Sequence, residues 1–235
     1  MGIVKGRHQS QLKVIAAIPC LNEEAFIGDI VTRAKKYVDK VIVIDDGSTD
    51  NTSEAAQAAG AEVIKHETSQ GTGAATKTAF EAVKSSQADI LVTLDGDGQH
   101  NADEIPLLLA PILNEEADLV IGSRFLHPDF HQMPKYRKFG IDVITFLYNF
   151  GSRVRVSDSQ CCFRAHNHKL IGAVNITEAG FSFSVQVLIQ ARKKGFTIKE
   201  VPISCIYHSQ GSSLNPITHG LGVAFNVIKL RLFSR

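Results

Sequence analysis

Two carboxylates that lie two residues apart, Asp95 and Asp97, follow the mostly apolar run of residues 88–94. A buried strand that ends here would present both side chains in the loop that follows it. Carboxylates bind hard divalent cations, and Mg²⁺ or Mn²⁺ with few protein ligands completes its shell with water and substrate phosphates. The pair therefore predicts a metal site that also receives a phosphate, although the same pattern alone is typical of a solvated turn.

Three more polar loops follow apolar runs in the first half of the chain. They begin at Pro19, Asp45 and Gly122, with the sequences Pro-Cys-Leu-Asn-Glu, Asp-Asp-Gly-Ser-Thr-Asp and Gly-Ser-Arg. Asp46 is placed to accept hydrogen bonds from a base or ribose, whereas a turn followed by a helix cap explains the same segment structurally. Arg124 offers a planar set of donors to a phosphate, or else pairs with an acidic loop.

Residues 70–76, Gln-Gly-Thr-Gly-Ala-Ala-Thr, partly match a dinucleotide-binding pattern. The third small position of that pattern is Thr76, and the segment does not directly follow the first apolar run, which disfavours a dinucleotide oxidoreductase. We expect Gly71 and Gly73 instead to let the backbone of a helix entrance approach a ligand closely.

Apolar runs rich in Val and Ile alternate with segments of helical spacing. The predicted strands are residues 14–18, 41–44, 61–64, 90–94 and 119–121. The predicted helices are residues 23–38, 53–60, 73–86 and 102–115. This alternation predicts an α/β fold with a mostly parallel sheet buried on both faces. Ligands of such sheets bind beyond the carboxyl ends of the strands, so the four polar loops are expected to face one ligand.

The regular alternation fades from about residue 125, without a linker-like change of composition. We expect one domain over residues 1–235. Its first half, residues 13–124, would carry the ligand loops, and residues 125–214 would supply the surface for a second substrate.

The chain has 235 residues, is 44% hydrophobic and carries a formal net charge of +1. It can bury a sizeable core, and its charge gives no reason to expect a nucleic-acid partner. Residues 1–13 lack the apolar centre of a signal peptide, and no apolar run is long enough to span a bilayer. We expect a cytoplasmic protein whose four cysteines are free thiols, with peripheral membrane contact left open.

Five motifs, in this order along the chain, resemble those of family 2 glycosyltransferases, which have a GT-A fold. They are residues 19–24 (Pro-Cys-Leu-Asn-Glu-Glu), 41–50 (Val-Ile-Val-Ile-Asp-Asp-Gly-Ser-Thr-Asp), 71–74 (Gly-Thr-Gly-Ala), 95–100 (Asp-Gly-Asp-Gly-Gln-His) and 122–124 (Gly-Ser-Arg). Further segments resemble the polyprenyl-phosphate branch, which makes dolichyl-phosphate mannose or dolichyl-phosphate glucose. These segments are residues 157–164, 183–188, 195–203 and 211–213.

The resemblance implies roles for particular residues. The residues around the nucleoside would be Pro19, Leu21, Glu23, Ile44 and Asp46. The residues at the metal and the diphosphate would be Asp95, Gly96 and Asp97, with Gln99 completing the metal shell. The residues that address phosphate and the acceptor would be Arg124, Ser157, Arg164 and His208.

The implied activity is an inverting, metal-dependent transfer of mannose or glucose from GDP-mannose or UDP-glucose to a polyprenyl or dolichyl phosphate. The cofactor would be Mg²⁺ or Mn²⁺, and the enzyme would act at the cytoplasmic face of a membrane. Two alternatives stay open: a glycan or another hydroxyl compound as the acceptor, and a nucleotide-sugar-binding module without turnover.

Four positions depart from the pattern of that branch. His208 stands where relatives usually carry Arg, Leu214 where many carry Lys, and Gln186 where they often have Glu. Cys162 replaces a usual Gly. The changes at His208 and Leu214 put diphosphate binding by their loop in doubt. The change at Gln186 would remove an acidic side chain and its role, and Cys162 would reshape the acceptor loop.

Two segments combine apolar residues at helical spacing with basic residues. In the tail, residues 215–235, the apolar positions are Leu221, Ala224, Phe225, Ile228 and Leu232. Residues 139–150 are flanked by Lys135, Arg137, Lys138, Arg153 and Arg155. A basic amphipathic helix can lie on a membrane surface, while packing on the core or on a partner subunit explains both segments equally well.

Overall fold

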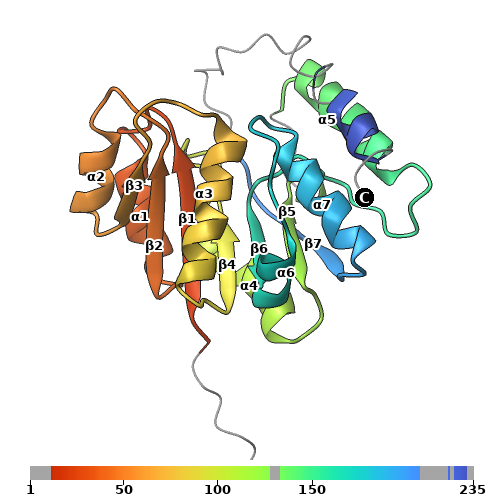
Figure 1. The fold of residues 1–235 in the computed structure, drawn as a ribbon, viewed down its shortest axis with the longest axis horizontal. Coiled ribbons are helices and arrows are strands. Elements are labelled where there is room, and N and C mark those ends of the chain that lie inside the picture. Colours follow the sequence, from red (N-terminus) through yellow and green to blue (C-terminus); the bar gives the residue numbers. More distant parts are fainter. Residues whose placement is uncertain (1–11, 128–132, 207–221, 223–224, 232–235) are drawn as a thin grey trace, which may run out of the picture.

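The computed structural model of the protein describes residues 12–127, 133–206, 222 and 225–231, with a seven-stranded sheet at the centre (Figure 1). The strands are β1 (Val14–Cys20), β2 (Lys40–Asp45), β3 (Glu62–Lys65), β4 (Ile90–Thr93), β5 (Leu119–Ser123), β6 (Arg164–Asn167) and β7 (Ile198–Pro202). Their order is β3-β2-β1-β4-β6-β5-β7. Only β6 is antiparallel to its neighbours in this sheet, so the prediction of a mostly parallel α/β fold is confirmed.

The central strands are buried along nearly their whole length because helices pack on the sheet. Strands β1, β2, β4 and β5 are almost entirely buried, whereas β3 and β7 at the two edges are partly exposed. Parallel strands that are covered on both faces read as continuous apolar runs. That is why the Val- and Ile-rich runs identified these strands in the sequence.

The helices are α1 (Ile27–Ala34), α2 (Thr52–Ala58), α3 (Thr72–Ser85), α4 (Ile105–Leu113), α5 (Lys135–Asn149), α6 (His168–Ala173) and α7 (Phe183–Lys193), with 3₁₀ turns η1 (Ala102–Glu104) and η2 (Arg124–Leu126). In Figure 1, α3, α6 and α7 lie in front of the sheet. Helix α4 packs on β5, β6 and β7, and α1 contacts α2 and η1. Helix α5 lies apart, at one corner of the molecule.

Helix α1 is shorter than the predicted helix of residues 23–38. The backbone N–H groups of Asn22 and Glu23 donate to the Ser48 and Thr52 hydroxyls, at 2.9 and 2.8 Å. These bonds hold the segment after β1 against the segment after β2. The helix therefore begins only at Ile27, and the residues before it stay available as a loop at the strand ends.

His166 on β6 is buried between helices α3 and α7. Its side chain lies edge-on to the Phe80 ring, with ring centroids 5.1 Å apart, and its Nδ1 lies 3.3 Å from the Leu91 carbonyl oxygen. Burial, and then the charge of Arg164, lower the pKa of His166 to about 3. The folded protein therefore holds this ring neutral, whereas the unfolded chain protonates it below about pH 6.5.

We expect the free energy of unfolding to lose a contribution from His166 as the pH falls from about 6.5 towards 3. The slope from this one group approaches about 1.4 kcal/mol per pH unit, because the unfolded state binds the extra proton. His166→Gln, which keeps a donor for the Leu91 carbonyl, should flatten this part of a urea-unfolding profile. His168→Gln, at an exposed position, is the control and should follow the parent curve. Parallel curves for parent and His166→Gln would contradict this assignment.

Candidate functional site

The polar loops lie at the carboxyl ends of β1, β2, β4 and β5. Strand β1 pairs with β2 on one side and with β4 on the other. The chain therefore reverses its direction of travel across the sheet between β1 and β4. Ligands of open α/β sheets bind beyond the strand ends at such a switch point. The loop after β4 packs tightly here, because a Cβ on Gly96 would clash with the Cys20 sulfur and meet the Pro19 carbonyl oxygen at 3.5 Å. Gly96 is therefore needed for close packing.

Asp95 and Asp97 form the centre of the site. Burial and the charge of Asp97 raise the pKa of Asp95 to about 7, and Glu23 adds to this effect. Arg124 and Arg137 act on Asp95 in the opposite direction. The Asp95 side chain keeps 34% of its surface exposed, so it is accessible to a ligand.

Glu23 joins this carboxylate cluster. Burial, followed by the charges of Asp97 and Asp50, raises the pKa of Glu23 to about 7. The sequence prediction puts Glu23 beside a nucleoside, whereas the structure puts its carboxyl group within electrostatic reach of Asp97. Three acidic side chains from the loops after β1 and β4 thus crowd negative charge at the switch point.

The donor set of this cluster fits a hard divalent cation. Gln99 donates from Nε2 to one oxygen of Asp97 at 2.7 Å and from its backbone N to the other at 3.0 Å. Among the described residues, no three His, Cys, Asp or Glu side chains form a closed metal cage. Two carboxylates and an amide leave positions for water and phosphate oxygens, as Mg²⁺ and Mn²⁺ require. A bound cation would also offset the charge that raises the pKa of Asp95.

His100 lies beside this cluster and is absent from the predicted site. Its Nδ1 is 4.0 Å from an Asp95 oxygen, its Nε2 is 3.7 Å from the Cys161 sulfur, and its ring packs on Phe163. Burial lowers the pKa of His100 to about 4, so the ring is neutral. Its place at the end of the Asp-Gly-Asp-Gly-Gln-His motif is the only sequence signal that could have found it.

Arg124 forms a buried two-pronged ion pair with Asp158. Its Nε and Nη2 donate to the two oxygens of Asp158 at 2.7 and 2.8 Å, and its backbone N donates at 3.3 Å. Burial would raise the pKa of Asp158, but Arg124 lowers it overall. The pair joins the end of β5 to the loop before β6, and it orients a guanidinium whose charge acts on Asp95. The sequence analysis included Arg137 among the basic residues near residues 139–150 and Asp158 in the segment 157–164, but it gave neither residue a role in this site.

Asp46 fastens the loop of residues 66–71. Its carboxylate accepts hydrogen bonds from the Ser69 hydroxyl at 2.8 Å, the Gln70 N–H at 3.0 Å and the Gly71 N–H at 2.8 Å, and it lies 2.6 Å from His66 Nδ1. Burial would raise the pKa of Asp46, but these hydrogen bonds lower it. Asp46 is 4% exposed, so its carboxylate binds the loop of residues 66–71 and does not face the solvent.

The glycines of the α3 entrance lie close to the loop before α7. The Gly73 N–H donates to the Ala179 carbonyl at 2.7 Å, and a Cβ on Gly71 would lie 2.7 Å from the same oxygen. Gly73 leaves no room for a side chain beside the Glu178 carbonyl. The loop before α7 thus fills the space that side chains at these two positions would need, and a close approach of their backbone to a ligand stays a prediction.

Two other predicted side chains also point into the protein. Ile44 is fully buried in the core, because β2 is covered on both faces, and its side chain cannot line an open pocket. Arg164 is 2% exposed and donates to the carbonyls of Cys161, Ser159 and Ser184 at 2.7 to 2.9 Å. Its donors hold the turn before β6, so the structure gives Arg164 a supporting position rather than a phosphate-facing one.

Ser157 and Leu21 lie at the rim of the site. Ser157 is tied to Glu200 through its N–H at 2.7 Å and its hydroxyl at 3.0 Å, and its hydroxyl lies 2.6 Å from that of Ser123. Leu21 is 43% exposed at the end of β1. Ser157 thus lies beside the end of β5 and Leu21 just after β1, and their predicted roles toward an acceptor and a nucleoside stay predictions.

The four unusual positions divide into two groups. Gln186 accepts hydrogen bonds from the Thr177 and Glu178 N–H groups and donates to the Thr177 hydroxyl at 2.6 Å, so an amide rather than an acid shapes this loop. Cys162 is buried, and burial raises the pKa of its thiol well above the usual value. His208 and Leu214 lie outside the described residues.

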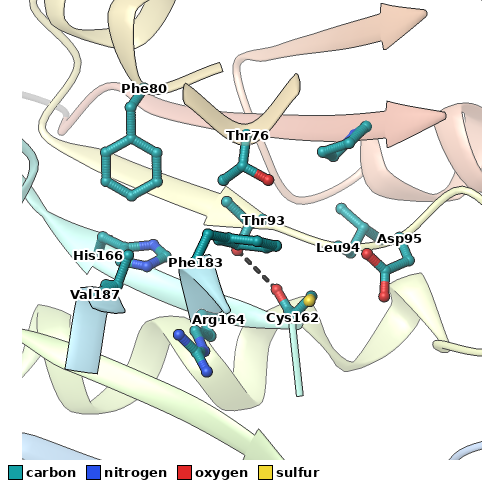
Figure 2. Close-up of a pocket in the computed structure, with 11 residues that line it drawn as sticks. Thr76, Phe80, Thr93, Leu94, Asp95, Cys162, Arg164, His166, Phe183 and Val187 are labelled. Atoms are coloured by element: carbon teal, nitrogen blue, oxygen red, sulfur yellow. Dashed lines mark hydrogen bonds between the residues drawn. The ribbon is translucent and has the colours of Figure 1, made fainter. Parts of the chain in front are cut away.

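A small apolar pocket lies directly behind Asp95 (Figure 2). Asp95 and His166 lie at opposite ends of it, with Phe183 from α7 between them and Phe80 from α3 beside His166. The Thr93 hydroxyl donates to the Cys162 carbonyl at 2.8 Å and ties β4 to the loop before β6. This apolar backing excludes water from one side of Asp95 and explains why burial is the main cause of its raised pKa.

Comparison with known proteins agrees with this architecture. A UDP-N-acetylglucosamine–dolichyl-phosphate N-acetylglucosaminyltransferase of Methanococcus voltae is 32% identical, covering 92% of this chain and 94% of the relative. An undecaprenyl-phosphate mannosyltransferase of Micrococcus luteus is 29% identical, covering 86% and 87%. Glucosyl-3-phosphoglycerate synthase from Mycobacterium tuberculosis, solved with Mn²⁺, uridine diphosphate and phosphoglyceric acid, has the same fold, with a TM-score of 0.74, 21% identity and coverage of 94% and 78%. Residues 15–174 match the family model of glycosyl transferase family 2, and the chain therefore belongs to that family of GT-A enzymes.

Proposed function

We propose that this glycosyltransferase moves a sugar from a nucleoside diphosphate sugar to a polyprenyl phosphate, with inversion and with Mg²⁺ or Mn²⁺. The observation that carries the proposal is the opposition of charges at the switch point. Carboxylates of Asp95 and Asp97 suit a metal–diphosphate group, while Arg137 and the Asp158-paired Arg124 bring positive charge to the same place. The relatives named for dolichyl-phosphate and undecaprenyl-phosphate transfer support the acceptor.

The donor would bind through the loops after β1, β2 and β4. Leu21 offers exposed apolar surface to the nucleoside, and Asp46 keeps the wall formed by residues 66–71 in place. Asp95, Asp97 and Gln99 would hold the cation, which neutralises charge on the departing nucleoside diphosphate. Because Gln99 fixes the Asp97 carboxylate, the protein pays little reorganisation cost when the donor arrives.

The acceptor phosphate would approach from the side of Arg124 and Arg137. Its oxygen forms the bond to the anomeric carbon as the bond from that carbon to the diphosphate oxygen breaks, and attack from the opposite face inverts the centre. A phosphate monoester is already ionised near neutral pH, so the reaction needs no protein base. Catalysis then rests on positioning and on charge stabilisation.

The proposed acceptor has a hydrocarbon chain, so the reaction would take place where the enzyme meets a membrane. We place it at the cytoplasmic face. Among the described residues, no helix combines the length and apolarity needed to cross a bilayer.

The first test incubates the enzyme with polyprenyl phosphate, Mn²⁺ and one labelled donor at a time: GDP-mannose, UDP-glucose or UDP-N-acetylglucosamine. We expect label in the organic phase with one of these donors, and a loss of at least about 100-fold with Asp97→Asn, because a metal ligand is lost. Asp29→Asn, on the exposed surface of α1, is the matched control and should retain transfer. Nucleotide binding without any transfer would instead identify a nucleotide-sugar-binding module. Labelling of a hydroxyl acceptor but not of polyprenyl phosphate would show that the acceptor is a glycan or another hydroxyl compound.

The second test removes the metal. Chelation with EDTA should abolish transfer, and Mn²⁺ or Mg²⁺ should restore it. Calorimetry supplies an independent readout, since Mn²⁺ should tighten the binding of the nucleoside diphosphate to the parent but not to Asp97→Asn. Full transfer in EDTA would exclude the metal-dependent mechanism.

A further inference from the structure

Helix α5 exposes a continuous apolar stripe. Five large side chains follow one another at spacings of three and four residues, which places them on one face of the helix. They are Tyr136 (63% exposed), Phe139 (71%), Val143 (37%), Phe146 (64%) and Phe150 (66%). A contiguous exposed patch of this kind marks an interaction surface on a folded protein.

The opposite face of α5 carries the buried side chains of this helix. Ile141, Ile144, Thr145 and Tyr148 are buried there. Arg192 of α7 donates to the Tyr148 carbonyl at 2.9 Å and lies over the Tyr148 ring. The buried face therefore anchors the helix, and of the stripe side chains Phe150 also contacts the protein, through Arg231 at 5.9 Å from its ring centre.

The C-terminal helical segment, residues 225–231, extends this surface. Figure 1 shows it, in blue, alongside α5. Arg231 donates to the carbonyls of Leu147 and Phe150, which fixes the segment against the end of α5. Val227 and Leu230 are buried beneath, whereas Phe225 and Ile228 are 70% and 44% exposed.

The surroundings of the stripe are strongly basic. Residues 135–155 contain five Lys or Arg and one acidic residue, and residues 225–231 contain two basic residues and no acidic one. These segments thus carry a formal charge of +6 in a chain whose net charge is +1. Their one acidic side chain, Asp142, is paired with Lys138 at 2.6 Å.

We propose that the stripe of α5, together with Phe225 and Ile228, is a docking face that inserts into the surface of an anionic lipid bilayer. Aromatic and aliphatic side chains flanked by Lys and Arg are the composition by which a helix lies in a membrane interface. This inference deepens the proposed function and rests on its lipid-linked acceptor. It names the surface through which the enzyme reaches that acceptor.

The position of α5 relative to the site agrees with this role. The charge of Arg137, in the first turn of α5, acts on Asp95, and Lys138 lies 5.2 Å from the centre of the Phe125 ring, next to Arg124. A bilayer in contact with the docking face would therefore meet the protein beside the carboxylate cluster. A phosphate head group at that interface would be close to the reacting centre.

The charge also favours a bilayer over a second copy of the chain as the occupant. A two-fold dimer through this face would bring two surfaces of charge +6 together, which is repulsive. Anionic lipids instead supply the complementary charge, and they attract Lys and Arg near a membrane surface.

The sequence contains no tryptophan, so one introduced residue can report on the docking face. Phe146→Trp should shift its fluorescence to shorter wavelength when vesicles of phosphatidylcholine and phosphatidylglycerol are added, and brominated lipids should quench it. Leu113→Trp, at a 50% exposed position on α4, is the matched control and should show neither change. Identical spectra of Phe146→Trp with and without vesicles would overturn the proposal.

Vesicle flotation measures the contribution of the stripe. Phe139→Ser combined with Phe146→Ser should weaken binding to anionic vesicles at least about tenfold, because two aromatic side chains that would be buried in the bilayer are lost. Leu107→Ser combined with Leu113→Ser on α4 should bind like the parent, and both double variants should keep the parent melting temperature. Binding that is equal for the two double variants would contradict the assignment, as would a stripe-dependent dimer seen by light scattering without vesicle binding.

The same variants separate this inference from the proposed function. With a short-chain, water-soluble polyprenyl phosphate, Phe139→Ser combined with Phe146→Ser should transfer sugar like the parent. Vesicle binding through the stripe without transfer to any acceptor would overturn the proposed function alone. Transfer to polyprenyl phosphate by a parent that does not bind vesicles would overturn the docking face alone.

Discussion

Repulsion between carboxylates at the end of β4 is the constraint on which the rest of the site depends. Asp95, Asp97 and Glu23 are held together by the backbone of two adjacent loops, and burial raises the pKa values of Asp95 and Glu23 to about 7. A folded chain relieves such crowding either by protonating a carboxylate, which is what a raised pKa means, or by placing positive charge beside it. Arg124 and Arg137 provide part of that positive charge, and the proposed divalent cation would provide the remainder.

The two halves of the chain meet through main-chain contacts that keep this arrangement in place. Asp46 holds the loop before α3, the Gly73 N–H reaches the Ala179 carbonyl, and Gln186 shapes the loop that carries this carbonyl. The Arg124–Asp158 pair makes a second connection, from the end of β5 to the loop before β6. Removing either partner of that pair would leave a buried charge uncompensated, which is strongly destabilising. The second half of the chain is thus part of the scaffold of the carboxylate site.

The basic, apolar surface of α5 lies on one side of the molecule and would orient it on a membrane. Its N-terminal end adjoins the residues that act on Asp95, whereas its aromatic side chains face outward. In the proposed reaction, a water-soluble donor and a lipid-linked acceptor would reach one centre from different phases. A site at the strand ends, with the proposed docking face beside it, would meet that requirement without a spanning segment among the described residues.

The sequence by itself determined the fold class, the family and the loops that carry the site. Continuous Val and Ile runs indicate strands that are buried on both faces. The ordered motifs at the ends of these strands are local features of the sequence, so they can be recognised without knowledge of the tertiary packing. It could not decide which polar side chains face the ligand. Asp46, Arg164 and the glycines of the α3 entrance have the residue types of a ligand site, yet their partners are backbone groups of residues distant along the chain. It equally could not reveal Asp158, His100 or the exposure of the α5 stripe. Each of these depends on which segments pack against one another, and only the tertiary structure decides that.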